Sequence, residues 1–109
     1  MAFTYAVLGG GRQGTAAAYD MAEWGDAEHV LVADISVDAA KASARRVNDL
    51  IGRDIASAHQ LDVTDHAALV EFLAPVDSFL SAVPYWNNPG ITGAAIEARA
   101  CMTDLGGKT

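Results

Sequence analysis

The chain has 109 residues, of which 51% are hydrophobic, and a formal net charge of −7 at pH 7. This length suits one domain with a buried core, and the composition excludes a disordered segment. No apolar run approaches the ~20 residues that a transmembrane helix needs. Seven basic residues in an acidic chain argue against a nucleic-acid backbone as partner, so an anionic ligand must be held by backbone N–H groups and a helix dipole.

The N-terminal segment runs from Met1 directly into an apolar strand, without a basic region before it. We therefore expect no secretory signal and a cytoplasmic location. Cys101 is the only cysteine, which excludes an internal disulfide.

The first half of the chain alternates strand-like and helix-like segments. Residues 4–8 form a short apolar run that stops at glycine, which is typical of a strand buried on both faces. An alanine-rich helix is predicted over residues 14–24, with Gly25 in the C′ position that ends it. Residues 29–34 form a second buried strand. Ser36 then caps a helix whose apolar face consists of Ala40, Ala44, Val47 and Ile51.

The second half repeats this plan. A third strand is predicted over residues 55–61, although polar residues dilute it. Thr64 is the predicted cap of a helix that ends near Pro75. Its buried residues are predicted to be Ala68, Leu69, Phe72 and Leu73. Residues 76–83 form the fourth strand.

The last predicted elements are a helix and a fifth strand. Asn88 as N-cap and Pro89 as the first helical residue indicate a helix start. The helix continues to about residue 100, and residues 101–105 form the strand. This β-α-β-α-β-α-β-α-β alternation predicts an α/β fold, a Rossmann-type doubly wound parallel sheet of five strands with helices on both faces.

Residues 9–14 read Gly-Gly-Gly-Arg-Gln-Gly and match the pattern G-x-G-x-x-G directly between the first strand and the first helix. In this pattern Gly9 permits a tight turn, Gly11 lets the backbone approach a pyrophosphate, and Gly14 allows close packing of helix on strand. A P-loop is excluded, because no lysine follows the last glycine. The cofactor-binding residues predicted here are Gly9, Gly11, Arg12, Gln13 and Gly14.

Asp34 ends the second strand, 20 residues beyond Gly14, where this pattern expects an acid. A carboxylate there accepts hydrogen bonds from both adenosine ribose hydroxyls and repels a 2′-phosphate. Ile35, which we also place at the cofactor, and Ser36 offer no arginine for such a phosphate. Arg12 is the nearest cation and is expected to flank the pyrophosphate. The predicted cofactor is therefore NAD, with NADP disfavoured.

Two further segments follow strands and so reach the same sheet edge. Asp62 and Val63 come after the third strand, where they meet either the adenine or the start of the next helix. The small residues Ala82, Val83 and Pro84 end the fourth strand and are predicted to lie beside the nicotinamide ribose.

The next loop, Tyr85-Trp86-Asn87, is unusually aromatic. It is predicted to be either a wall of the nicotinamide or substrate pocket or a contact with another domain or subunit. Asp104, in the fifth strand, is a further candidate to face the ligand.

The remaining polar candidates have simpler interpretations. The three histidines have no cysteine or carboxylate at zinc-ligand spacing, so we expect no metal site. Cys101 is expected to be a small buried hydrophobe. Asp77 is expected to be a turn residue.

Four segments together resemble the saccharopine dehydrogenase-like oxidoreductases, most closely the branch that contains NAD-dependent lysine 6-dehydrogenase. They are the glycine turn, the Val-Ala-Asp strand end, Ser-Ala-Val-Pro-Tyr-Trp-Asn after the fourth strand and Thr-Asp-Leu-Gly-Gly after the fifth. The resemblance spans essentially all 109 residues. Its most specific part is the combination of Val-Pro-Tyr with Asp-Leu-Gly-Gly.

The resemblance implies an N-terminal Rossmann domain joined to a C-terminal α/β domain, and chemistry at a C–N bond of an amino acid. The family's cofactor positions match Gly9, Gly11, Gly14 and Asp34, and its loop near the nicotinamide matches Val83, Pro84 and Tyr85. The sequence departs from the family at Trp86, where relatives often have Tyr or Phe, and at Lys108, where they have Asn or His. Both departures concern the substrate.

Family members run to several hundred residues. We therefore expect residues 1–109 to be the NAD(P)-binding domain of a longer two-domain enzyme, a homo-oligomer whose amino-acid substrate binds through a C-terminal domain. No catalytic residue is assigned, and the isolated chain is expected to be inactive. The alternative is a stand-alone NAD-sensing regulatory Rossmann domain without catalysis.

Overall fold

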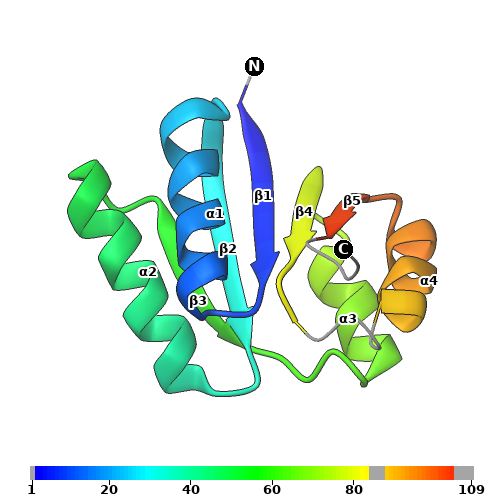
Figure 1. Ribbon diagram of the computed structural model, residues 1–109. Helices are drawn as coiled ribbons and strands as arrows, with labels where there is room; N and C mark the ends of the chain where they lie inside the picture. Colours follow the sequence, from blue (N-terminus) through cyan, green and yellow to red (C-terminus); the bar gives the residue numbers. More distant parts are fainter. Residues whose placement is uncertain (1, 84–87, 105–109) are drawn as a thin grey trace.

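The computed structural model of the chain describes residues 2–83 and 88–104. Strands and helices alternate throughout these residues, as the sequence predicts (Figure 1). In chain order the elements are β1 (Phe3–Leu8), α1 (Arg12–Trp24), β2 (Ala27–Asp34), α2 (Val37–Ile51), β3 (Ala56–Gln60), α3 (His66–Leu73), β4 (Ser78–Ser81), α4 (Asn88–Ala98) and β5 (Cys101–Asp104).

The strands form one sheet in the order β3-β2-β1-β4-β5, and all neighbouring pairs are parallel. The chain first builds outward from β1 to β3. It then crosses through α3 to the other side of β1 and continues with β4 and β5. The order therefore reverses between β1 and β4, and open α/β sheets bind ligands at such a switch point, outside the carboxyl ends of the strands.

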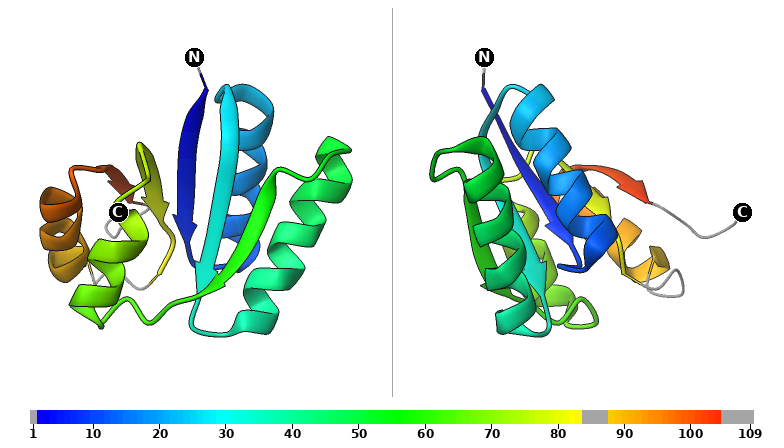
Figure 2. Two further views of the ribbon diagram at one scale, coloured as in Figure 1. Left: turned by 180° about the vertical axis from the view of Figure 1, so that it is seen from behind. Right: turned by 60° about the vertical axis from the view of Figure 1, so that its left-hand side comes forward.

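The helices form two layers, with α1 and α2 on one face of the sheet and α3 and α4 on the other (Figure 2). The central strand β1 contributes to both cores: Val7 packs under α1 and α2, whereas Ala6 and Leu8 pack under α3 and α4. The prediction that this strand is buried on both faces is confirmed for its last three residues, which are fully buried.

The helix α2 forms as its sequence predicts. The Ser36 hydroxyl accepts a hydrogen bond from the Ala39 N–H (3.2 Å) and caps the helix. Three of the four predicted face residues are buried, and Ile51 is partly buried. The helix ends at Gly52, whose φ of +85° gives the left-handed conformation of a glycine cap.

One predicted helix end is confirmed and one is wrong. The helix α1 ends at Trp24, directly before Gly25, as predicted, although the positive φ (+54°) falls on Asp26 and not on Gly25 (φ −94°). The cap of α3 is Asp65 rather than Thr64, because the Asp65 carboxylate accepts the hydrogen bond from the Ala68 N–H (3.2 Å). The Thr64 hydroxyl instead donates a hydrogen bond to the Asp62 carboxylate.

Other differences are smaller. β3 and β4 are shorter than predicted, and α4 already includes Asn88, the predicted N-cap. Cys101 is exposed rather than buried, because it starts the edge strand β5. Asp77 is the turn residue expected, and its carboxylate accepts a hydrogen bond from the Thr4 N–H (2.9 Å). Of the helices in residues 2–83 and 88–104, none has the length and apolar character to cross a membrane.

Candidate functional site

The turn between β1 and α1 contains glycines with different neighbours. Gly9 has a φ of +108°, which side chains rarely adopt. A Cβ at Gly14 would lie 1.8 Å from the carbonyl oxygen of Gly9, so only glycine lets α1 pack this closely on the turn. A Cβ at Gly11 would meet nothing within 4 Å. The fold itself therefore needs no glycine at that position, which faces open space.

The helix α1 begins without a side-chain cap. Its N-cap is Gly11, and its first turn contains no acidic residue. The helices α2 and α3, by contrast, are capped by the side chains of Ser36 and Asp65. The first N–H groups of α1 thus lack a side-chain acceptor, and the helix dipole adds a positive potential there. This is the arrangement that binds phosphate groups at helix N-termini.

Asp34 connects the end of β2 to the glycine turn. One carboxylate oxygen accepts a hydrogen bond from the Gly10 N–H (2.7 Å), and the other accepts from the Ser36 N–H (2.8 Å). An ionised carboxylate has about four acceptor sites, so both oxygens can still accept hydroxyl groups of a ligand. Asp34 therefore has a structural role that the sequence did not reveal, because it fixes the turn as well as facing the cavity.

A cavity of about 370 Å³ lies at the carboxyl ends of β1 to β4. Its volume is within the range of small-molecule sites. It brings together eight residues predicted from the sequence: Gly9, Gly11, Asp34, Ile35, Asp62, Val63, Ala82 and Val83. The sequence reasoning missed three other lining residues, Ala33, Leu61 and Thr64. These three residues could have been predicted as lining residues, because they lie next to predicted strand ends.

Asp62 lines the same cavity as Gly9 and Gly11 of the glycine turn. Its Oδ1 accepts hydrogen bonds from the hydroxyl (2.6 Å) and the N–H (2.9 Å) of Thr64. These two hydrogen bonds lower the pKa of the Asp62 carboxyl below its usual value. Of the two predicted roles, the helix cap belongs to Asp65, three residues later, and Asp62 borders the cavity instead.

The other predicted residues of the turn lie outside this cavity. Arg12 lines a second cavity, of about 560 Å³, on the outer side of α1 and α2. Gln13 is exposed and lines neither cavity, whereas Gly14 is buried in the packing of α1. No sequence pattern indicated this second cavity, because it forms between two helices rather than at strand ends.

Pro84, Tyr85, Trp86 and Asn87 lie outside the described residues, so their predicted roles stay predictions. Asp104 is the last residue of β5, and its Cα pairs with that of Ser81 at the end of β4. Its backbone thus reaches the expected edge of the sheet. Within residues 2–83 and 88–104, no group of three or more histidine, cysteine or acidic residues is placed to hold a metal ion.

The chain matches known proteins over nearly its whole length. The family model described as the saccharopine dehydrogenase NADP binding domain matches residues 5–108. No curated protein matches the sequence.

Solved structures match as well. Apo saccharopine dehydrogenase (L-Glu forming) from Saccharomyces cerevisiae is 28% identical with a TM-score of 0.77, and the match covers 98% of this chain and 22% of that one. Quinate dehydrogenase from Corynebacterium glutamicum, in complex with NAD, is 25% identical with a TM-score of 0.64, and the match covers 77% and 28%. UDP-glucose-4-epimerase from Stenotrophomonas maltophila, with bound NAD, shares the fold at 15% identity and a TM-score of 0.75, over 94% and 36%. This chain therefore spans about a fifth of the length of the yeast enzyme.

Proposed function

Since this chain belongs to the family of saccharopine dehydrogenase NADP binding domains, we propose that its cavity binds NAD in preference to NADP, for an oxidoreductase acting on a C–N bond of an amino acid. The nicotinamide dinucleotide follows from the family and from the dinucleotide-binding structural relatives. The preference for NAD and the substrate class are our proposals.

The observation that carries the proposal is the position of Asp34 beside an uncapped helix. The pyrophosphate would bind at the N-terminus of α1, where Gly11 leaves the backbone open. The adenosine ribose would then lie at Asp34, whose carboxylate accepts the 2′-hydroxyl and repels a phosphate in its place. The apolar residues Ile35 and Val63 would flank the adenine on the cavity wall.

The substrate class rests on the family alone. We propose that a separate domain of a longer, homo-oligomeric protein supplies the substrate-binding and acid–base residues, because the yeast relative has about five times the length that this chain matches. Determining the coding sequence that follows Thr109 would test this. A further α/β domain supports the enzyme, and a stop codon supports a regulatory NAD sensor.

Calorimetric titration with NAD and NADP tests the cofactor assignment. The wild-type chain should bind NAD more tightly. Asp34→Asn should weaken NAD binding by 10- to 100-fold, the effect of losing hydrogen bonds to a charged group worth about 1.5–3 kcal/mol, and should narrow or reverse the preference over NADP. Asparagine retains one oxygen acceptor for the Gly10 N–H, which limits damage to the turn.

The matched control is Asp38→Asn, which removes the same charge from the exposed first turn of α2. It should leave both affinities within about twofold, since an exposed charge outside the cavity is screened. Equal or tighter binding of NADP to the wild-type chain would overturn the assignment.

A further inference from the structure

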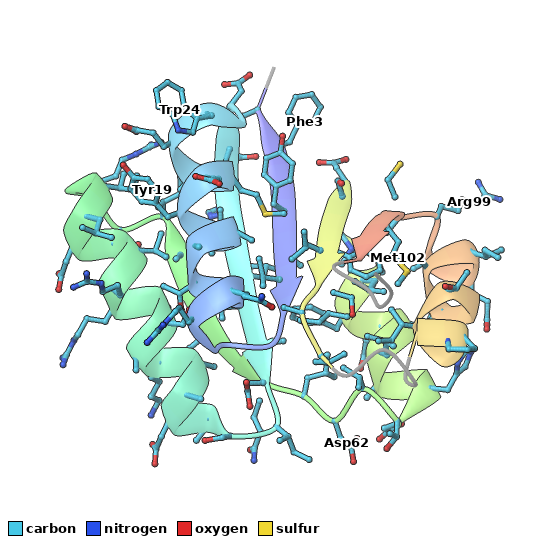
Figure 3. The ribbon with its side chains drawn as sticks, in the orientation of Figure 1. Phe3, Tyr19, Trp24, Asp62, Arg99 and Met102 are labelled. Carbon is cyan, nitrogen blue, oxygen red and sulfur yellow. The ribbon has the colours of Figure 1, made fainter. Side chains whose placement is uncertain are left out.

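The second cavity is a groove along the outer surface of α1 and α2, two helices that lie side by side in one layer (Figure 1). In Figure 3, Tyr19 lies between the two helices and marks the side of α1 that faces α2. Thr15, one turn earlier in α1, lies on the same side. Its hydroxyl forms a hydrogen bond with the hydroxyl of Ser43 (2.7 Å), and both residues line this outer groove. The proposed dinucleotide contacts include neither residue.

Ser43 is a polar residue on an apolar helix face. It is 3% exposed, and with Ser81 it is one of two buried polar residues in the part of the chain that the structure describes. The other buried residues of α2 are Ala40, Ala44 and Val47. A buried hydroxyl costs free energy unless it forms a hydrogen bond, and an alanine would continue the apolar face. Packing alone therefore does not explain the hydroxyl of Ser43.

Thr15 connects this hydroxyl pair to the glycine turn. The Thr15 hydroxyl donates a long hydrogen bond (3.5 Å) to the carbonyl oxygen of Gly10. A hydroxyl has one proton to donate, so the Thr15 oxygen accepts the proton of Ser43 while its own proton faces Gly10. The three groups thus form one directed chain, from the Ser43 hydroxyl through the Thr15 hydroxyl to the Gly10 carbonyl.

The Gly10 carbonyl belongs to the same peptide group as the N–H of Gly11. Residues 2–83 and 88–104 contain no cis peptide bond, and in a planar trans peptide the C=O and the N–H point in opposite directions. A Gly10 carbonyl held toward Thr15 therefore directs the Gly11 N–H away from Thr15. Gly11 lines the proposed cofactor cavity as well as the outer groove.

The turn needs such support because its three consecutive glycines, residues 9–11, have greater backbone freedom than other residues. The peptide before Gly10 is fixed by Asp34, whose carboxylate accepts the Gly10 N–H (2.7 Å). A Cβ at Gly10 would lie 3.0 Å from the carbonyl oxygen of Ala39, so the turn also packs closely on α2. The peptide after Gly10 is held by the Thr15 hydroxyl.

We infer that Thr15 and Ser43 are positioning residues of the proposed pyrophosphate site, which hold the Gly10–Gly11 peptide so that the Gly11 N–H donates to the bound phosphate. This role rests on the proposed dinucleotide function. Hydrogen bonds in a chain polarise one another. A Gly11 N–H that donates to an anion makes the Gly10 carbonyl a better acceptor, so ligand binding and the hydroxyl pair strengthen each other.

NMR titration of the isotope-labelled 109-residue chain with NAD, and with adenosine, which has no phosphate, tests this role. Thr15→Val removes the hydroxyl and keeps the branched shape of the side chain. It should weaken NAD binding by about five- to tenfold, the effect of losing one neutral hydrogen bond. Adenosine binding should stay within about twofold, because adenosine makes no phosphate contact. Thr15→Ser restores the hydroxyl and should recover most of the NAD affinity.

Ser43→Ala tests whether Ser43 acts through Thr15. It should weaken NAD binding less than Thr15→Val does. The double variant should bind NAD as Thr15→Val alone does, because Ser43 has no connection to the turn once the Thr15 hydroxyl is absent. The matched control is Thr92→Val, which removes an exposed hydroxyl from α4 on the opposite face of the sheet. It should change neither affinity.

Residual dipolar couplings of the Gly11 N–H, measured without ligand, report the orientation of the Gly10–Gly11 peptide directly. Thr15→Val should change this coupling, while the couplings within β1 and β2 stay as in the wild type and show that the variant is folded. A wild-type chain that binds neither NAD nor NADP would contradict the proposed function, and the Gly11 coupling would still test the positioning.

Four results would each overturn the role of the hydroxyl pair. They are a Gly11 coupling or an NAD affinity that Thr15→Val leaves unchanged, an equal loss of adenosine binding, a Thr15→Ser variant that binds NAD no better than Thr15→Val, and losses of affinity that add in the double variant.

Discussion

At the residue scale, Gly11 and Gly14 differ in what a side chain would meet. Gly14 faces the carbonyl oxygen of Gly9 at a distance that no Cβ can occupy, whereas Gly11 faces open space with an ordinary extended backbone. Gly14 is therefore needed for folding, whereas Gly11 is needed only if a ligand approaches the backbone. The two substitutions to alanine therefore separate stability from binding.

Gly11→Ala should change the stability of the chain by no more than about 1 kcal/mol, because the lower entropy of the unfolded chain is offset by the poorer N-cap preference of alanine. It should weaken NAD binding at least tenfold, since the methyl group occupies the space of the pyrophosphate. Gly14→Ala should destabilise the chain by about 1–3 kcal/mol or more. Urea denaturation and calorimetry measure the two effects, and an alanine at position 11 that binds NAD as the wild type does would contradict this assignment.

Asp34 shows why the candidate site could be predicted only in part from the amino-acid sequence. The spacing from Gly14 predicted it to be a cofactor contact, and it does line the cavity. Its hydrogen bond to the Gly10 N–H joins positions 24 residues apart, and no sequence pattern specifies such a contact. The same limit explains Arg12, whose position in the turn did not reveal that its long side chain lies on the groove side of α1.

At the scale of elements, the helices differ in how the N–H groups of their first turn are satisfied. Two of the three helices that begin within residues 2–83 satisfy their first N–H groups with a side chain, and α1 does not. The element order was predictable because apolar runs and glycines alternate along the chain. The cap of α3 was not, because Thr64 and Asp65 are adjacent residues of types that both cap helices.

Asp65→Ala should therefore destabilise the chain by about 0.5–2 kcal/mol, the usual cost of losing an N-cap. Thr64→Ala, the variant at the position predicted from the sequence, should cost less, because Thr64 donates to an exposed Asp62 carboxylate instead. Chemical denaturation of both variants under one set of conditions compares them. A larger loss for Thr64→Ala would show that the cap belongs to Thr64.

At the scale of the whole molecule, the site follows from the topology. Parallel strands bring their carboxyl ends to one edge, so loops as far apart in the sequence as Gly9 and Val83 had to meet there. This is why eight predicted residues share one cavity although no pairwise contact between the loops was predictable. The outer groove depends instead on how two helix surfaces pack, which the sequence pattern does not determine.

The lining of the cofactor cavity indicates what the chain can do alone. The cavity walls carry two aspartates, a threonine and otherwise glycine or apolar residues, with no cation among the described residues that line it. An amino-acid substrate would need a basic group for its carboxylate and an acid–base group near its amine. The described residues that line this cavity include neither of those groups.

We therefore expect binding without turnover. NAD at 100 times its dissociation constant should raise the free energy of unfolding by about 2.7 kcal/mol, because it binds only the folded chain. Under the same conditions, lysine or saccharopine should produce no reduced nicotinamide, measured by its absorbance. Gly11→Ala is the control and should lose most of the stabilisation at the same NAD concentration. Reduced nicotinamide formed by the 109-residue chain would show that the acid–base groups lie within it, in the loop at residues 84–87 or near the end of β5.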